Sequence, residues 1–497
     1  MLFSSFTFIA IYLPLVVYSF FLCPKYLGEN SSKIFLILAS LFFYAYWNPI
    51  YLPLLLCSIL FNYVISNKIR SKKSKPLLWT GITSNILLLG YFKYMDFFIE
   101  NINFLLATEW PLLKIILPLG ISFFTFQQIA YLIDSHHAKT DRHSFLDYSL
   151  FVAFFPQLIA GPIVHWKEMM PQFSDIRRHC FNADNFLKGT NIFILGFFKK
   201  ILIADNLAYL SDAIFNDTSS LDLVNSWLGG ICFMFQIYFD FSAYSDMAIG
   251  IALMMNIKLP VNFNSPYKAR NINDFWNRWH ITLTRWFFQY MFIPITAFLT
   301  KKRNTQTGMN LFVLTQVILI VFFLSGLWHG AAWTFIIWGT MHGLALVAYR
   351  LWQASHLSMH KYIAKTLTVI FLIIAAVVFR SSDLEILGNF IFAMTGGYGF
   401  LNPDSNITNN SLIIYTILIV PAYIIFFMPN VLEIVGYERI KQDLSAHYVA
   451  PFLKVKTNIF SINTNILVSI TYAMVFSLTL IKVMTANSPE AFIYFDF

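Results

Sequence analysis

Charged residues are scarce in this chain. Of its 497 residues only 12% are Asp, Glu, Lys or Arg, whereas 58% are hydrophobic, and the mean hydropathy is +0.62. Soluble domains carry about 25% charged residues, so this composition excludes an ordinary soluble globular protein. The sequence therefore predicts an integral membrane protein.

Cysteines and familiar site motifs are also scarce. The four cysteines are scattered and form no metal-binding or disulfide pattern: Cys23, Cys57, Cys180 and Cys232. The sequence has no G-x-S-x-G nucleophile motif, no H-E-x-x-H zinc motif, no Walker loop and no G-x-G-x-x-G. We therefore expect no bound metal, and the histidines become the best catalytic candidates.

Long hydrophobic runs recur from one end of the chain to the other. They include residues 3–23, 77–98, 111–133, 226–257, 309–327 and 412–428. Each is near or above the roughly 18 residues that a membrane-spanning helix needs. We predict an all-α, polytopic membrane protein with about 11 to 14 transmembrane or re-entrant helices.

The positions of the charges predict a topology. Residues 67–76 carry five Lys or Arg, which the positive-inside rule assigns to the cytoplasmic side. Residues 95–110 contain three acidic residues and no basic one, which fits the outside, and residues 134–143 are then assigned to the inside again. The N-terminus then lies outside if an odd number of spans precedes Asn67. Topology explains the net charge of +9 better than nucleic-acid binding does.

No long polar or low-complexity linker interrupts the chain, so we expect one membrane domain over residues 1–497. The most polar stretches, 163–191 and 258–280, remain rich in Trp, Phe and Pro and resemble interfacial loops and amphipathic helices. In "NDFWNRWHITLTRW", helical spacing would place Trp276 and His280 on one face and Arg278 and Arg285 on another.

His329 lies in "SGLWHGAAW", at the end of an uncharged hydrophobic run. An ionisable side chain at membrane depth is costly, so it needs a partner or a water-filled cavity and is a functional candidate. Gly326 and Gly330 would let backbone or ligand approach closely. The alternative is a buried histidine that is bonded to a neighbouring carbonyl.

Other polar candidates have simpler interpretations. His280 follows two tryptophans and could belong to an interfacial helix. His342 would point away from His329 on one continuous helix, so we do not pair them as ligands. Asp240 lies in the apolar stretch "QIYFDFSAYSDMAIG", where a polar network that locks helices together is the favoured interpretation.

Several segments together resemble a known family. "NFNSPYKARNINDFWNRWHITLTRWFFQYMFIPI" and "LSGLWHGAAWTFIIWGTMHG" strongly resemble the membrane-bound O-acyltransferases, in their bacterial alginate O-acetyltransferase-like branch. "LPLGISFFTFQQIAYLID", "FFPQLIAGPI", "GFFKKILIADNLA" and "VVFRSSDLEIL" follow the family in the same order. The resemblance covers nearly the whole chain, but residues 397–497 match mainly in hydrophobic character.

This resemblance implies a helical fold around a central tunnel that holds a catalytic histidine. Matched by motif, that residue is His329, and the second family histidine is His280. Candidates for binding the donor or substrate are Arg278, Arg285, Trp328 and Asp240, although the arginines could equally anchor the protein at the interface. The family pattern has Arg-Asp after Trp-Phe, whereas this chain has Phe288 and Gln289, so Arg285 is the candidate replacement for the cation.

The resemblance also implies a reaction. An acetyl group would move from cytoplasmic acetyl-CoA, a substrate and not a bound cofactor, across the inner membrane of a bacterium. Because the chain has no soluble domain to hold a polysaccharide, we expect a periplasmic esterase-like acetyltransferase as partner. The acceptor would be an alginate-like exopolysaccharide or peptidoglycan. The alternatives are D-alanyl transfer from a carrier protein toward teichoic acid, or a transporter or flippase with Asp240 and Asp246 as a proton relay.

Overall fold

The computed structural model describes residues 1–28, 30–137, 143–302, 310–400, 411–437, 466–485 and 491–493. Helices and their connections account for these residues, and no β-strand occurs among them. The predicted all-α fold is confirmed. Part of the predicted cytoplasmic loop 134–143 and part of the C-terminal region 397–497 lie outside the described residues.

Four described helical segments are long and apolar enough to cross a membrane. They are Phe8–Leu27, Pro49–Lys72, Leu311–His329 and Lys361–Arg380. Shorter apolar helices include Ser31–Ala45 and Leu384–Met394. The total of about 11 to 14 crossings stays a prediction.

The chain divides into two compact units. The first unit contains Met1–Phe198, Ala243–Val261 and Val431–Asp496, and the second contains Lys199–Ser242 and Asn262–Asn430. One long helix, α11 (Leu223–Met254), begins in the second unit and ends in the first. The single domain over 1–497 also stays a prediction.

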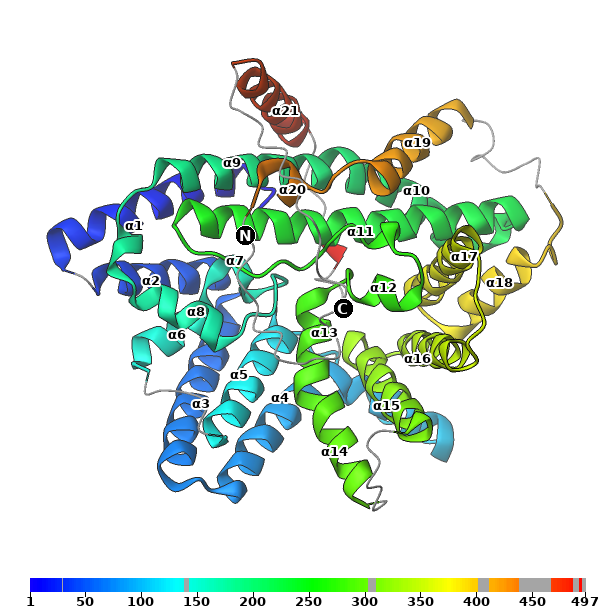
Figure 1. Cartoon of the computed structure of the whole chain (residues 1–497), viewed down its shortest axis with the longest axis horizontal. Coiled ribbons are helices and arrows are strands. Elements are labelled where there is room, and N and C mark those ends of the chain that lie inside the picture. Colours follow the sequence, from blue (N-terminus) through cyan, green and yellow to red (C-terminus); the bar gives the residue numbers. More distant parts are fainter. Residues whose placement is uncertain are drawn as a thin grey trace. The chain divides into compact units, whose positions relative to one another are not determined.

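Helices of the first unit pack both against their neighbours in sequence and against helices farther along the chain. They are α1 (Leu13–Leu27), α2 (Ser31–Ala45), α3 (Leu52–Lys72), α4 (Lys75–Leu106), α5 (Ile121–His136), α6 (Phe145–Ala153), α7 (Phe155–Leu158), α8 (Trp166–Ser174), α9 (Ala183–Phe198), α20 (Val431–Val435) and α21 (Ile466–Thr485). Figure 1 shows α3, α4 and α5 side by side, as their mutual contacts also indicate. The turn from α3 to α4 uses Lys73 in the left-handed conformation and Ser74, whose Oγ accepts a hydrogen bond from the Leu77 amide.

The helices of the second unit include those that carry the candidate site. They are α10 (Asp205–Asn216), the start of α11, α12 (Ile272–Trp276), α13 (Ile281–Phe287), α14 (Ile293–Lys302), α15 (Leu311–His329), α16 (Trp333–Ala354), α17 (Lys361–Arg380), α18 (Leu384–Met394) and α19 (Ser411–Phe427). Short π-helices cover Lys199–Ala204 and Phe288–Phe292, in addition to Phe8–Tyr12 of the first unit. Single 3-10 turns cover Pro49–Tyr51, Ile176–His179, Thr218–Ser220 and Pro266–Lys268.

Helices α15 and α16 form a tight hairpin in the second unit. At Gly326 an added Cβ would collide with the Phe335 carbonyl oxygen and lie 3.1 Å from the Gly339 Cα. At Gly339 it would lie 2.8 Å from the Gly326 amide nitrogen. Glycine at both positions therefore lets the two backbones touch. At Gly326, where the sequence predicts a close approach of backbone or ligand, the backbone of α16 is what approaches.

The predicted amphipathic helix through His280 is wrong. Helix α12 ends at Trp276, and His280 adopts a φ of 41° before α13 begins at Ile281. This left-handed residue breaks the helical period that would have aligned Trp276 with His280. A single-helix pattern cannot reveal such a break, because the break depends on contacts with residues far along the chain.

Candidate active site

The backbone around His280 is held by residues 262–264, which precede it in the chain. The Asn264 amide donates to the Arg278 carbonyl at 2.9 Å, and the Ile281 amide donates to the Asn262 carbonyl at 2.9 Å. These two bonds clamp the backbone on both sides of His280. They explain how a non-glycine residue is kept in the left-handed region, which is otherwise unfavourable.

The side chain of Asn262 selects the tautomer of His280. Its Oδ1 accepts hydrogen bonds from the Thr282 amide at 3.4 Å and the Thr282 hydroxyl at 2.8 Å. An amide N–H can only donate, so this atom of Asn262 is the oxygen. The His280 Nδ1 lies 3.0 Å from the same oxygen and must carry the proton, which leaves the lone pair on Nε2.

His280 is also fully buried. Its exposed fraction is 0%, and the ring of Phe241 packs edge-on against the imidazole at 4.8 Å between centroids. Burial lowers the pKa of His280 from 6.5 to about 3. The imidazole is therefore neutral at physiological pH.

His329 ends helix α15 and lies within a cage of aromatic rings. The centroid of its imidazole is 4.9 Å from that of Trp328, 4.9 Å from Trp338 and 5.4 Å from Phe379. The side chain is buried, with 5% of its surface exposed. Three helices of the second unit, α15, α16 and α17, therefore enclose the imidazole.

The two predicted catalytic histidines meet at one tryptophan. The Trp328 ring lies 6.4 Å from His280 and 4.9 Å from His329 between centroids. Residues 49 positions apart in the sequence thus contact a common indole. The structure brings together three of the six predicted site residues here.

His342 lies nearer to His329 than it would if both residues belonged to one continuous helix. Both imidazoles pack against the Trp338 ring, at 4.9 Å for His329 and 4.6 Å for His342. The assumption of one continuous helix is wrong, because α15 ends at His329 and α16 begins at Trp333. Reversal of the chain between these helices brings both histidines to one aromatic cluster.

The two predicted donor-binding arginines differ in their surroundings. The Arg278 guanidinium donates to Asp274 at 2.9 Å and to the Asn264 carbonyl at 3.3 Å, so it supports the segment that clamps His280. Arg285 is half-buried in the last turn of α13, immediately before the π-helix Phe288–Phe292. π-helical turns are frequent at functional sites.

Asp240 takes part in a buried ion-pair network. Its carboxylate accepts a hydrogen bond from the Lys200 ammonium at 2.7 Å, and Lys200 also contacts Asp205 at 2.9 Å. Lys200 and Asp240 are almost fully buried, so each neutralises the other's charge. This arrangement matches the polar network that the sequence favours for Asp240. Its neighbour on α11, Phe241, packs on His280.

Comparison with known proteins identifies the family. A family model described as "MBOAT, membrane-bound O-acyltransferase family" matches residues 135–382, a range that includes all six predicted site residues. The chain is 42% identical to a peptidoglycan O-acetyltransferase of Helicobacter pylori, over 84% of this chain and 86% of that protein. The chain belongs to the membrane-bound O-acyltransferase family.

Other relatives of this acyltransferase have different acceptors in their names. A probable alginate O-acetylase AlgI of Pseudomonas aeruginosa is 37% identical over 79% of this chain and 75% of that protein. A teichoic acid D-alanyltransferase of Bacillus subtilis is 30% identical over 50% of this chain and 65% of that protein. The predicted family, its membrane character and its acyltransferase activity are confirmed.

Sequence reasoning missed several residues of the acyltransferase that shape the site. Asn262 and Trp338 were not singled out, and neither was Lys200 as the partner of Asp240. Asn262 lies within the motif that begins "NFNSPYKAR", so the motif carried a signal. Its contact with His280, 18 residues later, becomes visible only in the folded chain.

Proposed function

We propose that this acyltransferase moves an acetyl group from cytoplasmic acetyl-CoA across the bacterial inner membrane for O-acetylation of a cell-surface or periplasmic polysaccharide. The arrangement of His280, Trp328 and His329 carries the proposal. A neutral buried imidazole and a second imidazole contact one indole, within a family of acyltransferases. The donor, the direction of transfer and the two catalytic roles are the proposed elements.

His329 acts as the general base in this mechanism. Its imidazole takes the proton of an acceptor hydroxyl while the hydroxyl oxygen attacks the thioester carbonyl. The tetrahedral intermediate then collapses, the carbon–sulfur bond breaks, and the coenzyme A thiolate receives a proton from the imidazolium. General base catalysis of this kind contributes about 10² to 10⁴ in rate. Transient transfer of the acetyl group to His329 itself is the second route that the site permits.

His280 acts as the second catalytic histidine. The bond to Asn262 fixes its ring and leaves the lone pair on Nε2, which can accept a hydrogen bond. The surrounding Trp328, Trp338 and Phe379 rings keep water away from the thioester, which limits its hydrolysis. Arg285 and Arg278 supply positive charge for the phosphates of the donor.

The polysaccharide acceptor is reached through a separate periplasmic protein with esterase-like acetyltransferase activity. Peptidoglycan and an alginate-like exopolysaccharide are the two acceptors that the relatives support. The D-alanyl relatives support their reaction less, because the matched region covers only half of this chain. We therefore favour acetyl transfer over D-alanyl transfer.

The test measures acetyl esters on cell-surface polysaccharide in cells that carry the wild type, His329→Ala or His280→Ala. The membrane level of each variant is measured in parallel, with Lys188→Gln as a control on the exposed surface of α9. We expect His329→Ala at normal abundance to abolish acetylation and His280→Ala to reduce it by at least tenfold. Unchanged acetylation in His329→Ala would remove that residue from the mechanism.

A second measurement distinguishes acetyl transfer from D-alanyl transfer and from transport. The purified acyltransferase is given acetyl-CoA or a D-alanyl carrier protein, and release of the free thiol is followed. Thiol release from acetyl-CoA that depends on His329 supports the proposal. Release from the carrier protein alone favours D-alanyl transfer. Loss of function on neutralising Asp240 and Asp246, with His329→Ala active, favours a transporter.

A further inference from the structure

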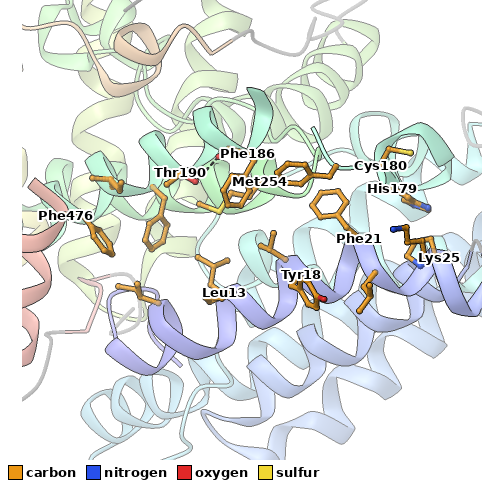
Figure 2. A pocket seen from close by; sticks show the side chains of 18 residues that line it. Leu13, Tyr18, Phe21, Lys25, His179, Cys180, Phe186, Thr190, Met254 and Phe476 are labelled. Atoms are coloured by element: carbon orange, nitrogen blue, oxygen red, sulfur yellow. Dashed lines mark hydrogen bonds between the residues drawn. The ribbon is translucent and has the colours of Figure 1, made fainter. Parts of the chain in front are cut away.

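The first unit contains a long apolar groove that the acyl-transfer chemistry does not use. It has a volume of about 1100 Å³ and is lined mainly by side chains of α1 and α9. Figure 2 shows Leu13, Tyr18 and Phe21 of α1 facing Phe186 and Thr190 of α9, with Phe476 of α21 at one end. All of its lining residues belong to the first unit, whereas the candidate active site lies in the second.

The two ends of this groove differ in chemistry. Lys25, His179 and Cys180 lie at the end opposite to Phe476 (Figure 2). Lys25 is exposed, and the described part of the chain provides it with no ion pair. The groove therefore has apolar walls along its length and a cation at one end.

More positive charge surrounds the Lys25 end. The 3-10 turn Ile176–His179 contacts α1 and carries Arg177 and Arg178. One acidic side chain, Asp175, contacts both arginines. Among the described residues this end therefore has an excess of positive charge, which the positive-inside rule assigns to the cytoplasmic side.

The length of the groove matches one leaflet of a bilayer. Between Leu13 and Lys25, α1 rises about 18 Å at 1.5 Å per residue. Half of the hydrocarbon core of a bilayer is about 15 Å thick. A lipid chain that extends from a headgroup at Lys25 would therefore run the length of the apolar wall.

Close packing of α9 and α11 shapes the floor of the groove. An added Cβ at Gly189 would lie 2.6 Å from the Gly250 carbonyl oxygen, so the two helices touch through their backbones. Phe193 and Met254, on the same two helices, are buried and line the groove. Tyr18 on its rim is 67% exposed, which leaves the groove accessible from the side.

We propose that this groove binds an anionic glycerophospholipid of the cytoplasmic leaflet, with an acyl chain along α1 and α9 and the phosphate at Lys25. The apolar lining excludes water and favours a hydrocarbon chain. The cation at the leaflet boundary favours a negatively charged headgroup. This binding site is independent of the proposed acetyl transfer, so either proposal can fail without the other.

The test uses photoactivatable lipids with a diazirine in the acyl chain. The full-length protein is placed in nanodiscs that contain labelled phosphatidylglycerol or labelled phosphatidylcholine, and cross-linked peptides are identified by mass spectrometry. We expect phosphatidylglycerol to label peptides of α1 and α9 more strongly than phosphatidylcholine does. Equal labelling by both lipids, or labelling spread evenly over the hydrophobic surface, would overturn the proposal.

Matched variants locate the headgroup and the chain. Lys25→Gln should lower labelling by phosphatidylglycerol about fivefold and leave labelling by phosphatidylcholine unchanged. Lys188→Gln removes the same charge from α9 outside the groove and should change neither. Thr190→Trp should fill the groove and reduce labelling by both lipids. Equal effects of Lys25→Gln and Lys188→Gln on labelling would contradict a headgroup site at Lys25. If Thr190→Trp does not fold, the positions of the cross-links in the wild-type protein still decide whether the lipid binds in the groove.

Discussion

The Nδ1–H of His280 donates a hydrogen bond to the side-chain oxygen of Asn262 at 3.0 Å. That oxygen also accepts from Thr282, which makes Asn262 a positioning residue for the imidazole. Because the bond determines which nitrogen holds the lone pair, it affects the chemistry of His280 without touching the substrate.

Replacing Asn262 should therefore impair turnover more than folding. We expect Asn262→Ala to lower kcat about ten- to a hundredfold, since the second catalytic histidine is no longer held in one orientation and one tautomer. Purified protein in detergent would be assayed for acetyl-CoA-dependent thiol release, with Asn389→Ala as a control, because Asn389 bonds to the Tyr398 hydroxyl on an exposed surface. A wild-type kcat in Asn262→Ala would exclude the positioning role.

The conservative variant Asn262→Asp gives a pH-dependent version of the same test. Its carboxylate can still accept the Nδ1 proton, so activity near neutral pH should largely return. Burial lowers the pKa of His280 to about 3 in the wild type, so its imidazole stays neutral down to about that pH. An adjacent carboxylate raises that pKa, and activity should be lost at a higher pH as the solution is acidified. Identical acid limbs of the kcat profile would contradict this assignment.

Asp240→Asn should destabilise the protein and leave the KM for acetyl-CoA unchanged. The variant removes one of the two carboxylates that contact the buried Lys200. Breaking a buried pair costs about 3 to 5 kcal/mol, and the remaining contact with Asp205 keeps the loss at or below that range. Thermal unfolding in detergent measures the loss. Asp184→Asn is the control, because Asp184 pairs with Lys188 on an exposed helix surface. An increased KM with unchanged stability would instead support donor binding by Asp240.

Arg285→Gln should raise the KM for acetyl-CoA about five- to tenfold with little change in kcat, because loss of one charge–phosphate contact costs about 1 kcal/mol or slightly more. Steady-state kinetics with acetyl-CoA provide the measurement. Arg350→Gln is the control, since Arg350 lies near the C-terminal end of α16 and bonds to the Asn273 side chain of α12. An unchanged KM in Arg285→Gln would leave this arginine as an interface anchor.

Gly339→Ala should destabilise the α15–α16 hairpin. The added methyl group would lie 2.8 Å from the Gly326 amide nitrogen, which forces backbone and not a flexible side chain to move. Overpacking of this kind costs about 1 to 3 kcal/mol. Gly388→Ala in α18 meets no atom within 4 Å and should stabilise slightly, so the two alanine variants should shift the unfolding temperature in opposite directions.

The sequence predicts the helical class and the two histidines, but not the contacts that position them. Hydropathy is sufficient for α15, whose residues before His329 carry no charge. Motifs identify His280 and His329 because the surrounding residues match a family. Helical periodicity fails at His280 and between His329 and His342, since a left-handed residue and a chain reversal interrupt the helices.

Partners distant in sequence were the least predictable. Lys200 and Asp240 are 40 positions apart, and they pair because the π-helix Lys199–Ala204 lies against α11 in the folded chain. The sequence could indicate that Asp240 needs a partner at membrane depth. It could not select Lys200 from the other cations, because burial of that lysine is a property of the fold.

Contact between Gly326 and Gly339 determines which substitutions this part of the fold can tolerate. The backbone, and not a layer of side chains, sets the spacing of α15 and α16, so His329 keeps its place when neighbouring side chains change. Phe379 packs on His329 and on Phe335, and these two phenylalanines can then vary in size without moving the helices that hold the imidazole. Variants of these aromatic residues should therefore keep the hairpin as long as both glycines are retained.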